Sequence, residues 1–241
     1  MAEKKYRQEI KRLLPPAQRL LLEQRIRAVM PPDIHSGSDG SYTIRSIYFD
    51  TITDRAYAEK EAGISEREKI RLRFYNCQDD LIKLERKEKR GNLIYKASMT
   101  VSKETADAMM QCDFSSLPDY RNPLSDSIYA MALSECLRPV VVVDYVRKAY
   151  TFPLGHTRIT FDSALLSGSP EIPIWTPEGG SDVLGEDTIL EIKFNQYLPE
   201  HISRLLNSVS AQRMALSKYV LCRNNLLWKQ GSFLGGRLLH L

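Results

Sequence analysis

The stretch Glu66-Arg67-Glu68-Lys69-Ile70-Arg71-Leu72-Arg73-Phe74-Tyr75 decides the fold of this 241-residue chain. Successive side chains of a β-strand point to opposite faces, so Lys69, Arg71 and Arg73 share one face and the apolar residues between them share the other. Three cations on one face repel one another, weakly on a wet surface and more strongly in a confined site. The stretch therefore predicts either a solvated amphipathic strand, or a strand whose cationic face lines a phosphate-binding cavity and whose apolar face packs against helices.

Composition and charge exclude several classes of protein. The net charge is +4, whereas a nucleic-acid-binding protein would carry a stronger and more clustered positive excess. The cysteines have no C-x-x-C spacing, which indicates reduced thiols and argues against zinc; they are Cys77, Cys112, Cys136 and Cys222. The charged N-terminus has no apolar run behind it, and no stretch reaches the roughly 18 apolar residues of a membrane span. We expect a cytoplasmic protein without a transmembrane segment that binds no nucleic acid, and a membrane-bound partner is left open.

Alternation of polar and apolar residues recurs along the chain. It predicts strands over 6–14, 42–50, 69–75, 81–87, 93–101, 139–152, 157–163 and 188–194, with a shorter strand at 172–175. Helical spacing of apolar residues predicts helices over 17–30, 54–61, 102–111, 125–136, 199–213 and 217–227. We expect residues 1–230 to form a single domain and residues 231–241 to form a C-terminal tail.

Basic residues dominate the polar faces of the predicted strands. They are Lys11, Lys69, Arg71, Arg73, Lys83, Lys87, Arg147, Arg158 and Lys193, against the acidic residues Glu9, Glu85, Asp162 and Glu191. A solvated sheet face mixes its signs more evenly. The pattern favours an α+β fold, an eight-stranded antiparallel β-barrel with a charged lumen and helices packed on the outside, over an ordinary sheet packed on helices. So many cations in one lumen predict a polyanionic ligand with a divalent metal ion held by the few carboxylates.

Eight short segments, taken in order, resemble a known family. They are YRQEIK, IRSIYFDT, EREKIRLRFY, LIKLERKEKRGNLIYK, DYVRKAY, TRITFD, ILEIKF and LSKYVLC. Together they resemble the polyphosphate polymerase (VTC, vacuolar transporter chaperone) domain of the triphosphate tunnel metalloenzyme superfamily, from about Tyr6 to Cys222. The resemblance implies an eight-stranded antiparallel tunnel that binds a nucleoside triphosphate and extends polyphosphate with its terminal phosphate, using Mn²⁺ or Mg²⁺.

The resemblance also implies roles for individual residues. The catalytic cations fall on Arg71, Arg73, Lys87, Arg147 and Arg158, and substrate-binding positions fall on Lys11, Lys96, Tyr145, Ser217 and Lys218. The metal-binding glutamate falls on Glu191. The strand pattern adds Lys69, Lys83 and Lys193 as substrate-binding cations, and Glu9 and Glu85 as further metal carboxylates.

Three of these residues have structural alternatives. Glu85 could pair with Lys87 or Lys83 and hold them in place instead of binding metal. Tyr145 could be a packing residue with its hydroxyl on a carboxylate. Ser217 is a reasonable N-cap for the last helix, which is compatible with a phosphate contact at that helix N-terminus.

Two positions depart from the pattern of the family. Arg7 stands where hydrolase relatives have the first glutamate of a Glu-x-Glu-x-Lys motif, which favours the polymerase branch over triphosphatases. Ala215 stands where a lysine often precedes the Ser-Lys pair by two residues, which affects how the tunnel exit holds its product.

We expect a metal-dependent polyphosphate polymerase that transfers the terminal phosphate of ATP to a growing polyphosphate chain. The alternatives are a hydrolase of triphosphate or polyphosphate on the same tunnel and a non-catalytic sensor of polyphosphate or inositol phosphates. Phosphoryl transfer needs positioning and charge neutralisation, and a phosphate chain end is already ionised at neutral pH, so no general base is required. None of the four histidines has a catalytic position, and removal of Arg71 or Arg73 should relieve repulsion with little loss of stability.

Overall fold

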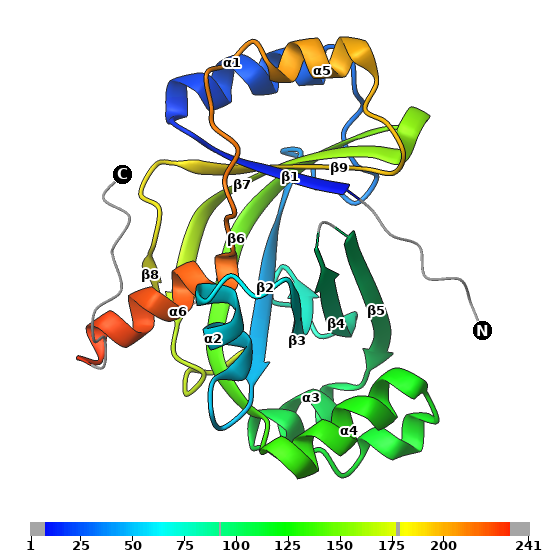
Figure 1. The fold of residues 1–241 in the computed structure, drawn as a ribbon, viewed down its shortest axis with the longest axis vertical. Helices are drawn as coiled ribbons and strands as arrows, with labels where there is room; N and C mark the ends of the chain where they lie inside the picture. Colours follow the sequence, from blue (N-terminus) through cyan, green and yellow to red (C-terminus); the bar gives the residue numbers. More distant parts are fainter. Residues whose placement is uncertain (1–7, 92, 177–178, 232–241) are drawn as a thin grey trace.

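One antiparallel sheet forms the centre of the molecule (Figure 1), seen in a computed structural model that describes residues 8–91, 93–176 and 179–231. The strand order is β1-β9-β7-β6-β2-β3-β4-β5, with the short β8 paired to β7. The strands are β1 (Gln8–Leu14), β2 (Ser41–Asp50), β3 (Glu66–Tyr75), β4 (Ile82–Arg90), β5 (Leu93–Val101), β6 (Arg138–Phe152), β7 (Thr157–Gly168), β8 (Gly180–Asp182) and β9 (Thr188–Phe194). The predicted α+β class and the eight antiparallel strands of the tunnel fold are confirmed.

Helices pack on both faces of this sheet. They are α1 (Pro16–Arg27), α2 (Arg55–Glu61), α3 (Lys103–Met110), α4 (Pro123–Glu135), α5 (Glu200–Leu206) and α6 (Lys218–Lys229). The apolar face of β3, which carries Leu72 and Phe74, belongs to one buried cluster with Met109 of α3 and Ile128 of α4. At the other end of the sheet, α1 and α5 pack on β7 and β9 (Figure 1). The apolar face of the opening stretch therefore packs against helices, as expected.

The last helix lies on the opposite face of the sheet. Ser46 pairs with Arg73 and Val143 in the two ladders of β2, so these residues share the face that bears the β3 cations. Val143 is buried in one cluster with Tyr219 and Val220 of α6. The helix α6 therefore packs on the cationic face, and its first residues reach the site described below.

The two ends of the sheet curl toward each other. No hydrogen-bonded ladder joins β1 to β5 within the described residues, and the free edge of β1 is partly paired by the segment that leads into α6. Met214 donates its backbone N–H to the Lys11 carbonyl at 2.9 Å, and Arg213 forms a β-bridge with Arg12. Edge strands carry unpaired backbone groups, and this segment satisfies some of them.

Two predicted elements differ from the observed ones. The helix expected over 199–213 ends at Leu206, where the chain turns and then leads to a β-bridge between Arg213 and Arg12 at the edge of β1. The strand expected at 172–175 is wrong, since this segment forms turns and bends and its Ile174 carbonyl accepts a hydrogen bond of 2.9 Å from Arg45. The Arg45 guanidinium thus holds this segment through its backbone carbonyls. Within the described residues, no helix is long and apolar enough to cross a membrane.

Candidate functional site

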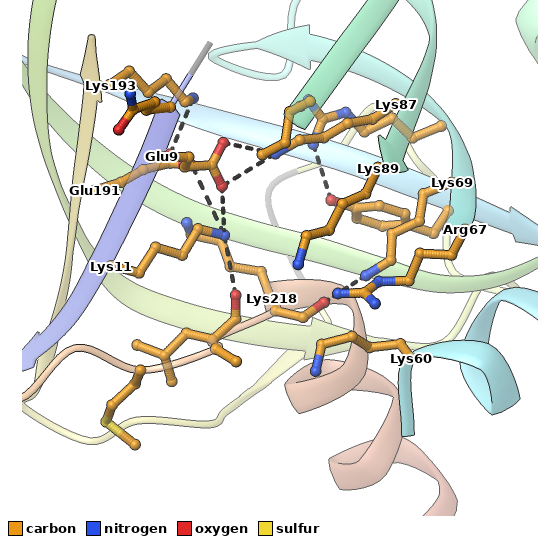
Figure 2. Close-up of a pocket in the computed structure, with 18 of the residues that line it drawn as sticks. Glu9, Lys11, Lys60, Arg67, Lys69, Lys87, Lys89, Glu191, Lys193 and Lys218 are labelled. Carbon is orange, nitrogen blue, oxygen red and sulfur yellow. Dashed lines mark hydrogen bonds and ion pairs between the residues drawn. The ribbon is translucent and has the colours of Figure 1, made fainter. Parts of the chain in front are cut away.

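A cavity of about 690 Å³ lies on the concave face of the sheet (Figure 2). Its wall includes most of the predicted site residues: Lys11, Lys69, Arg71, Arg73, Lys87, Arg147, Lys193, Lys218, Glu9, Glu191, Tyr145 and Ser217. These residues come from β1, β3, β4, β6, β9 and the start of α6. Side chains that are far apart along the chain therefore converge on one space, because each lies on the concave face of its own strand.

Glu85 binds two arginines of β3 and one lysine of β5. Arg71 donates to one Glu85 oxygen from Nε at 2.7 Å and from Nη2 at 2.6 Å, and Lys96 donates to the other oxygen at 2.7 Å. Arg73 lies 3.9 Å from the same carboxylate. Burial opposes the charged forms, but the attraction outweighs it, lowering the pKa of Glu85 and raising that of Arg71. Glu85 thus orients cations, and the alternative in which it pairs with Lys87 or Lys83 is wrong.

Tyr145 connects three cations of the cavity. Its hydroxyl accepts a hydrogen bond of 3.1 Å from Arg73, so it does not rest on a carboxylate. Its ring lies 5.2 Å from the Arg147 guanidinium carbon and 4.7 Å from the Lys218 ammonium group. Cations over an aromatic face are attracted by its quadrupole, so Tyr145 holds positive charge in place without neutralising it.

Asp162 of β7 belongs to the site, although sequence reasoning assigned it no individual role beyond being one of the few carboxylates of the lumen. Its fully buried carboxylate accepts hydrogen bonds from Arg147 at 2.6 and 2.8 Å and lies 2.5 Å from the Lys218 ammonium nitrogen. Burial opposes its ionisation, but Arg147 and Lys218 lower the pKa of Asp162 to about 2. Alternation along β7 placed it on the polar face, yet nothing local indicated partners on β6 and α6.

Glu9 and Glu191 lie on neighbouring strands with a shared lysine. Lys11 Nζ is 3.1 Å from Glu9 and 3.8 Å from Glu191, and Lys193 Nζ is 3.2 Å from Glu191. The Glu9 carboxylate also accepts a hydrogen bond of 2.9 Å from Lys87. Burial and mutual repulsion oppose both charges, but these lysines outweigh that effect and hold the pKa of Glu9 and Glu191 below the usual value. Both carboxylates are therefore ionised at neutral pH.

The same two carboxylates provide the donor set that suits a hard divalent cation. No group of three acidic, histidine or cysteine side chains is arranged around a common point in the part of the chain that the structure describes, and Glu85 does not join Glu9 and Glu191. Mg²⁺ in phosphate-binding enzymes is typically held by one or two carboxylates, with substrate phosphates and water completing its shell. Glu9 and Glu191 line the cavity and fit this requirement, whereas Glu85 is outside the lining.

Four predicted residues do not line the cavity, and one of them is Glu85, whose contacts are given above. Arg158 lies on the same face of β7 as Asp162, but its guanidinium turns to Asp33 at 2.8 Å and to the Tyr42 hydroxyl at 2.9 Å. Lys83 stands opposite Arg73 in the β3–β4 ladder, outside the lining. Lys96 reaches the site through its hydrogen bond to Glu85.

The cavity also has members that the sequence did not single out. They are Gln8, Tyr48, Lys60, Arg67, Lys89, Leu93, Ile94, Arg213, Met214 and Leu216. Arg67 and Lys89 could have been found by extending the alternation of β3 and β4 by one step each. Lys60 is on α2 and offered no strand pattern, so only the fold brings it here.

Comparison with known proteins identifies the family. The family model of the VTC domain matches residues 6–227. This chain belongs to the VTC domain family. A comparison with curated proteins finds no match.

Solved structures were also compared with this chain. One similar structure is HpAC1 from Hippeastrum, an adenylyl cyclase candidate with a dominant triphosphatase activity: the TM-score is 0.54 at 13% identity, covering 95% of this chain and 97% of that chain. Another is the PH1819 protein of Pyrococcus horikoshii OT3, with a TM-score of 0.48 at 14% identity over 93% of this chain and 99% of that chain. The likeness to HpAC1 shows a shared fold and nothing about the activity of this VTC-family chain.

Proposed function

We propose that this VTC-family protein is a cytoplasmic, metal-dependent polyphosphate polymerase that transfers the terminal phosphate of ATP to a growing polyphosphate chain. The observation that carries the proposal is the convergence of cations from five strands and two helices on a single cavity. Such a density of positive charge is compensated well by a ligand with one negative charge on each repeating unit.

The arginines and lysines have different parts in the proposed reaction. Arg71, Arg73 and Arg147 present planar guanidinium groups that can bind two phosphate oxygens each, and their carboxylate and tyrosine partners fix those groups before substrate arrives. Lys11 and Lys87 act as point charges near Glu9. Positioned cations stabilise the charge that is spread over the transferred phosphoryl group, which is the main requirement of phosphoryl transfer.

Glu9 and Glu191 would hold Mn²⁺ or Mg²⁺ in the working enzyme. When bound, such an ion neutralises phosphate charge and polarises phosphoryl oxygens. The residues of the chain then bind and orient the two phosphate groups, and the ionised end of the polyphosphate chain is the nucleophile. Because this nucleophile is already ionised, the reaction requires no proton acceptor from the protein.

The carboxylates of the site favour polymerisation over hydrolysis. Hydrolysis gains from a base that takes a proton from water, and a good base has a pKa near neutrality. Glu85, Asp162 and Glu191 all form ion pairs, and their pKa values lie below the ordinary ones. None of the described histidines lines the cavity. Arg7, which also argued against hydrolysis, lies outside the described residues.

A triphosphatase or polyphosphate hydrolase on the same tunnel is the second candidate. The fold shared with HpAC1, whose activity is that of a triphosphatase, supports it. A binding protein for polyphosphate or inositol phosphates is the remaining alternative, and it would need the same cations.

The test is incubation of the purified protein with ATP and Mn²⁺, with the products separated by gel electrophoresis. We expect chains longer than triphosphate, and we expect Arg71→Ala to abolish them while Arg25→Ala, an exposed arginine of α1, keeps them. Release of orthophosphate without chain growth would establish the hydrolase instead. Tight binding of polyphosphate or an inositol phosphate without turnover would establish the sensor.

A further inference from the structure

Two neighbouring strands set cations opposite cations at one end of the cavity. In the β3–β4 ladder, Arg67 faces Lys89 and Lys69 faces Lys87, and the next pair on the same face joins Arg71 to Glu85. Like charges directly opposite each other destabilise an antiparallel pair. The pair of Arg71 and Glu85, deep in the site, therefore has one positive and one negative charge. The two pairs nearer the end of the cavity consist of cations alone.

Lys60 of α2 joins this end of the cavity, and we call Lys60, Arg67, Lys69 and Lys89 the cationic rim. Figure 2 shows these four side chains along one side of the cavity, away from Glu9 and Glu191. Within the described residues, none of the four forms an ion pair, whereas Arg71, Lys87 and Arg147 each have a carboxylate partner. The positive charges of the rim are therefore not paired with carboxylates, whereas those of the deeper part of the cavity are.

The contacts of the rim are with neutral groups. Lys69 donates a hydrogen bond of 2.6 Å to the Ser217 hydroxyl and lies 4.9 Å from the centre of the Tyr219 ring. Arg67 donates to the Ile64 carbonyl. Burial, and after it the neighbouring cations, lower the pKa of Lys69 well below its usual value, and burial with Arg67 and Lys60 lowers that of Lys89. These cations repel one another, and an anion would relieve the repulsion.

The arrangement suits a long ligand. Arg67, Lys69, Arg71 and Arg73 alternate along one strand, so the first and the last lie about 20 Å apart at the ordinary rise of a strand. A nucleoside triphosphate held at Arg71 and Arg73 would leave the rim unfilled, whereas an extended chain of phosphates would reach both. The size and linear order of the cation series therefore match a chain better than a compact anion.

We propose that the cationic rim is a second subsite, which binds internal phosphates of a polyphosphate chain whose end lies at Arg71 and Arg73. The inference deepens the proposed function and rests on polyphosphate being the substrate. Its consequence is a preference for long chains over tripolyphosphate, set by Lys60, Arg67 and Lys89.

Binding of two ligands without turnover tests this subsite. Tripolyphosphate and long-chain polyphosphate are titrated separately into the wild type and into the triple variant Lys60→Ala, Arg67→Ala, Lys89→Ala, without ATP or Mn²⁺. We expect the triple variant to lose at least about tenfold in affinity for the long chain and much less for tripolyphosphate. The slope of log affinity against log salt should become shallower by about two for the long chain only.

A second triple variant controls for total charge. It removes three exposed cations outside the cavity by the changes Arg25→Ala, Arg204→Ala and Lys229→Ala. The ratio of its affinity for long-chain polyphosphate to its affinity for tripolyphosphate should stay at the wild-type value. Thermal melting without ligand shows whether the rim variant is folded, and its melting temperature should equal or exceed that of the wild type because repulsion is removed. If the triple variant does not fold, Lys60→Ala with Lys89→Ala gives the same comparison.

The outcomes separate the subsite from the reaction. Equal losses of affinity for long-chain polyphosphate and tripolyphosphate would overturn the proposal, since the rim would then only add to the positive electrostatic potential of the whole cavity. Unchanged affinity for the long chain would also overturn it, because the rim would be a solvated surface. Failure of chain growth with ATP and Mn²⁺ overturns the polymerase alone, while the absence of any long-chain preference in the wild type overturns the rim alone.

Discussion

Glu9 of β1 and Lys87 of β4 form an ion pair of 2.9 Å across the cavity, although five strands separate β1 from β4 in the order of the sheet. The pair joins the two halves of the curled sheet by side chains at a place where the described residues have no backbone ladder. It also fixes one of the carboxylates that suit a divalent cation beside one of the cations proposed to bind phosphate.

Glu9→Gln should loosen this closure. Glu9 is almost fully buried, so its loss leaves Lys87 and Lys11 with less compensation, and we expect the free energy of unfolding to fall by roughly 1–3 kcal/mol. Polyphosphate should stabilise the variant more than the wild type, since it supplies the missing negative charge. Urea denaturation with and without polyphosphate measures both effects, with the exposed Glu200→Gln as the control. Equal stabilisation of both proteins would contradict this role.

Arg71→Ala should abolish nucleotide binding and also destabilise the protein. The sequence suggested little loss of stability, but Arg71 donates two hydrogen bonds to the buried Glu85, which would lose its closest partner. Breaking a buried pair from one side costs about 3–5 kcal/mol. Adding Glu85→Gln to Arg71→Ala should recover part of that loss, and a double-mutant cycle of denaturation midpoints measures it. Additive effects of the two changes would show that the pair is not coupled.

Asp162→Asn should weaken phosphate binding through Arg147 and Lys218. The pKa of Asp162 is about 2 in the folded protein, so the folded state binds fewer protons than the unfolded state as pH falls below about 4. The stability that this carboxylate provides is therefore lost between about pH 4 and pH 2. The variant should show a flatter dependence of stability on pH in that range and weaker polyphosphate binding at pH 7. Glu186→Gln, at an exposed site, should change neither.

Polyphosphate binding should weaken as pH rises through about 8. Burial lowers the pKa of Lys193 to about 8 against the attraction of Glu191 and Glu9, so the ammonium group loses its proton in this range. Phosphate groups are already ionised there and do not mask the effect. Lys193→Arg keeps its charge and should reduce the loss of affinity between pH 7 and pH 9. Adding Lys69→Arg should reduce it further, because burial also lowers the pKa of Lys69.

The stability of the ligand-free protein should change with pH in the opposite direction to its affinity for polyphosphate. Between about pH 8 and the ordinary pKa of lysine, the unfolded chain binds more protons at Lys193 than the folded protein does. Stability without ligand should therefore rise with pH in this range, while affinity falls. Thermal melting in both conditions checks the sign, and parallel changes would contradict the assignment to Lys193.

The sequence by itself determined which residues face inward. Side-chain alternation is a local property of an extended chain, so the shared face of Arg71 and Arg73, the strand bounds near them and the basic character of the lumen could be predicted from residues close in sequence. Family segments in the right order then predicted the tunnel fold, which the match over residues 6–227 supports.

Only the tertiary structure decided which charges compensate one another. Glu9 and Lys87 are 78 positions apart, and Lys69 and Ser217 are 148 apart, so their contacts depend on the curl of the whole sheet and on where α6 begins. The same holds for Asp162, whose partners come from a neighbouring strand and a distant helix. A strand pattern fixes the face of each side chain but not its partner across a cavity, because that distance is set by sheet curvature and helix packing.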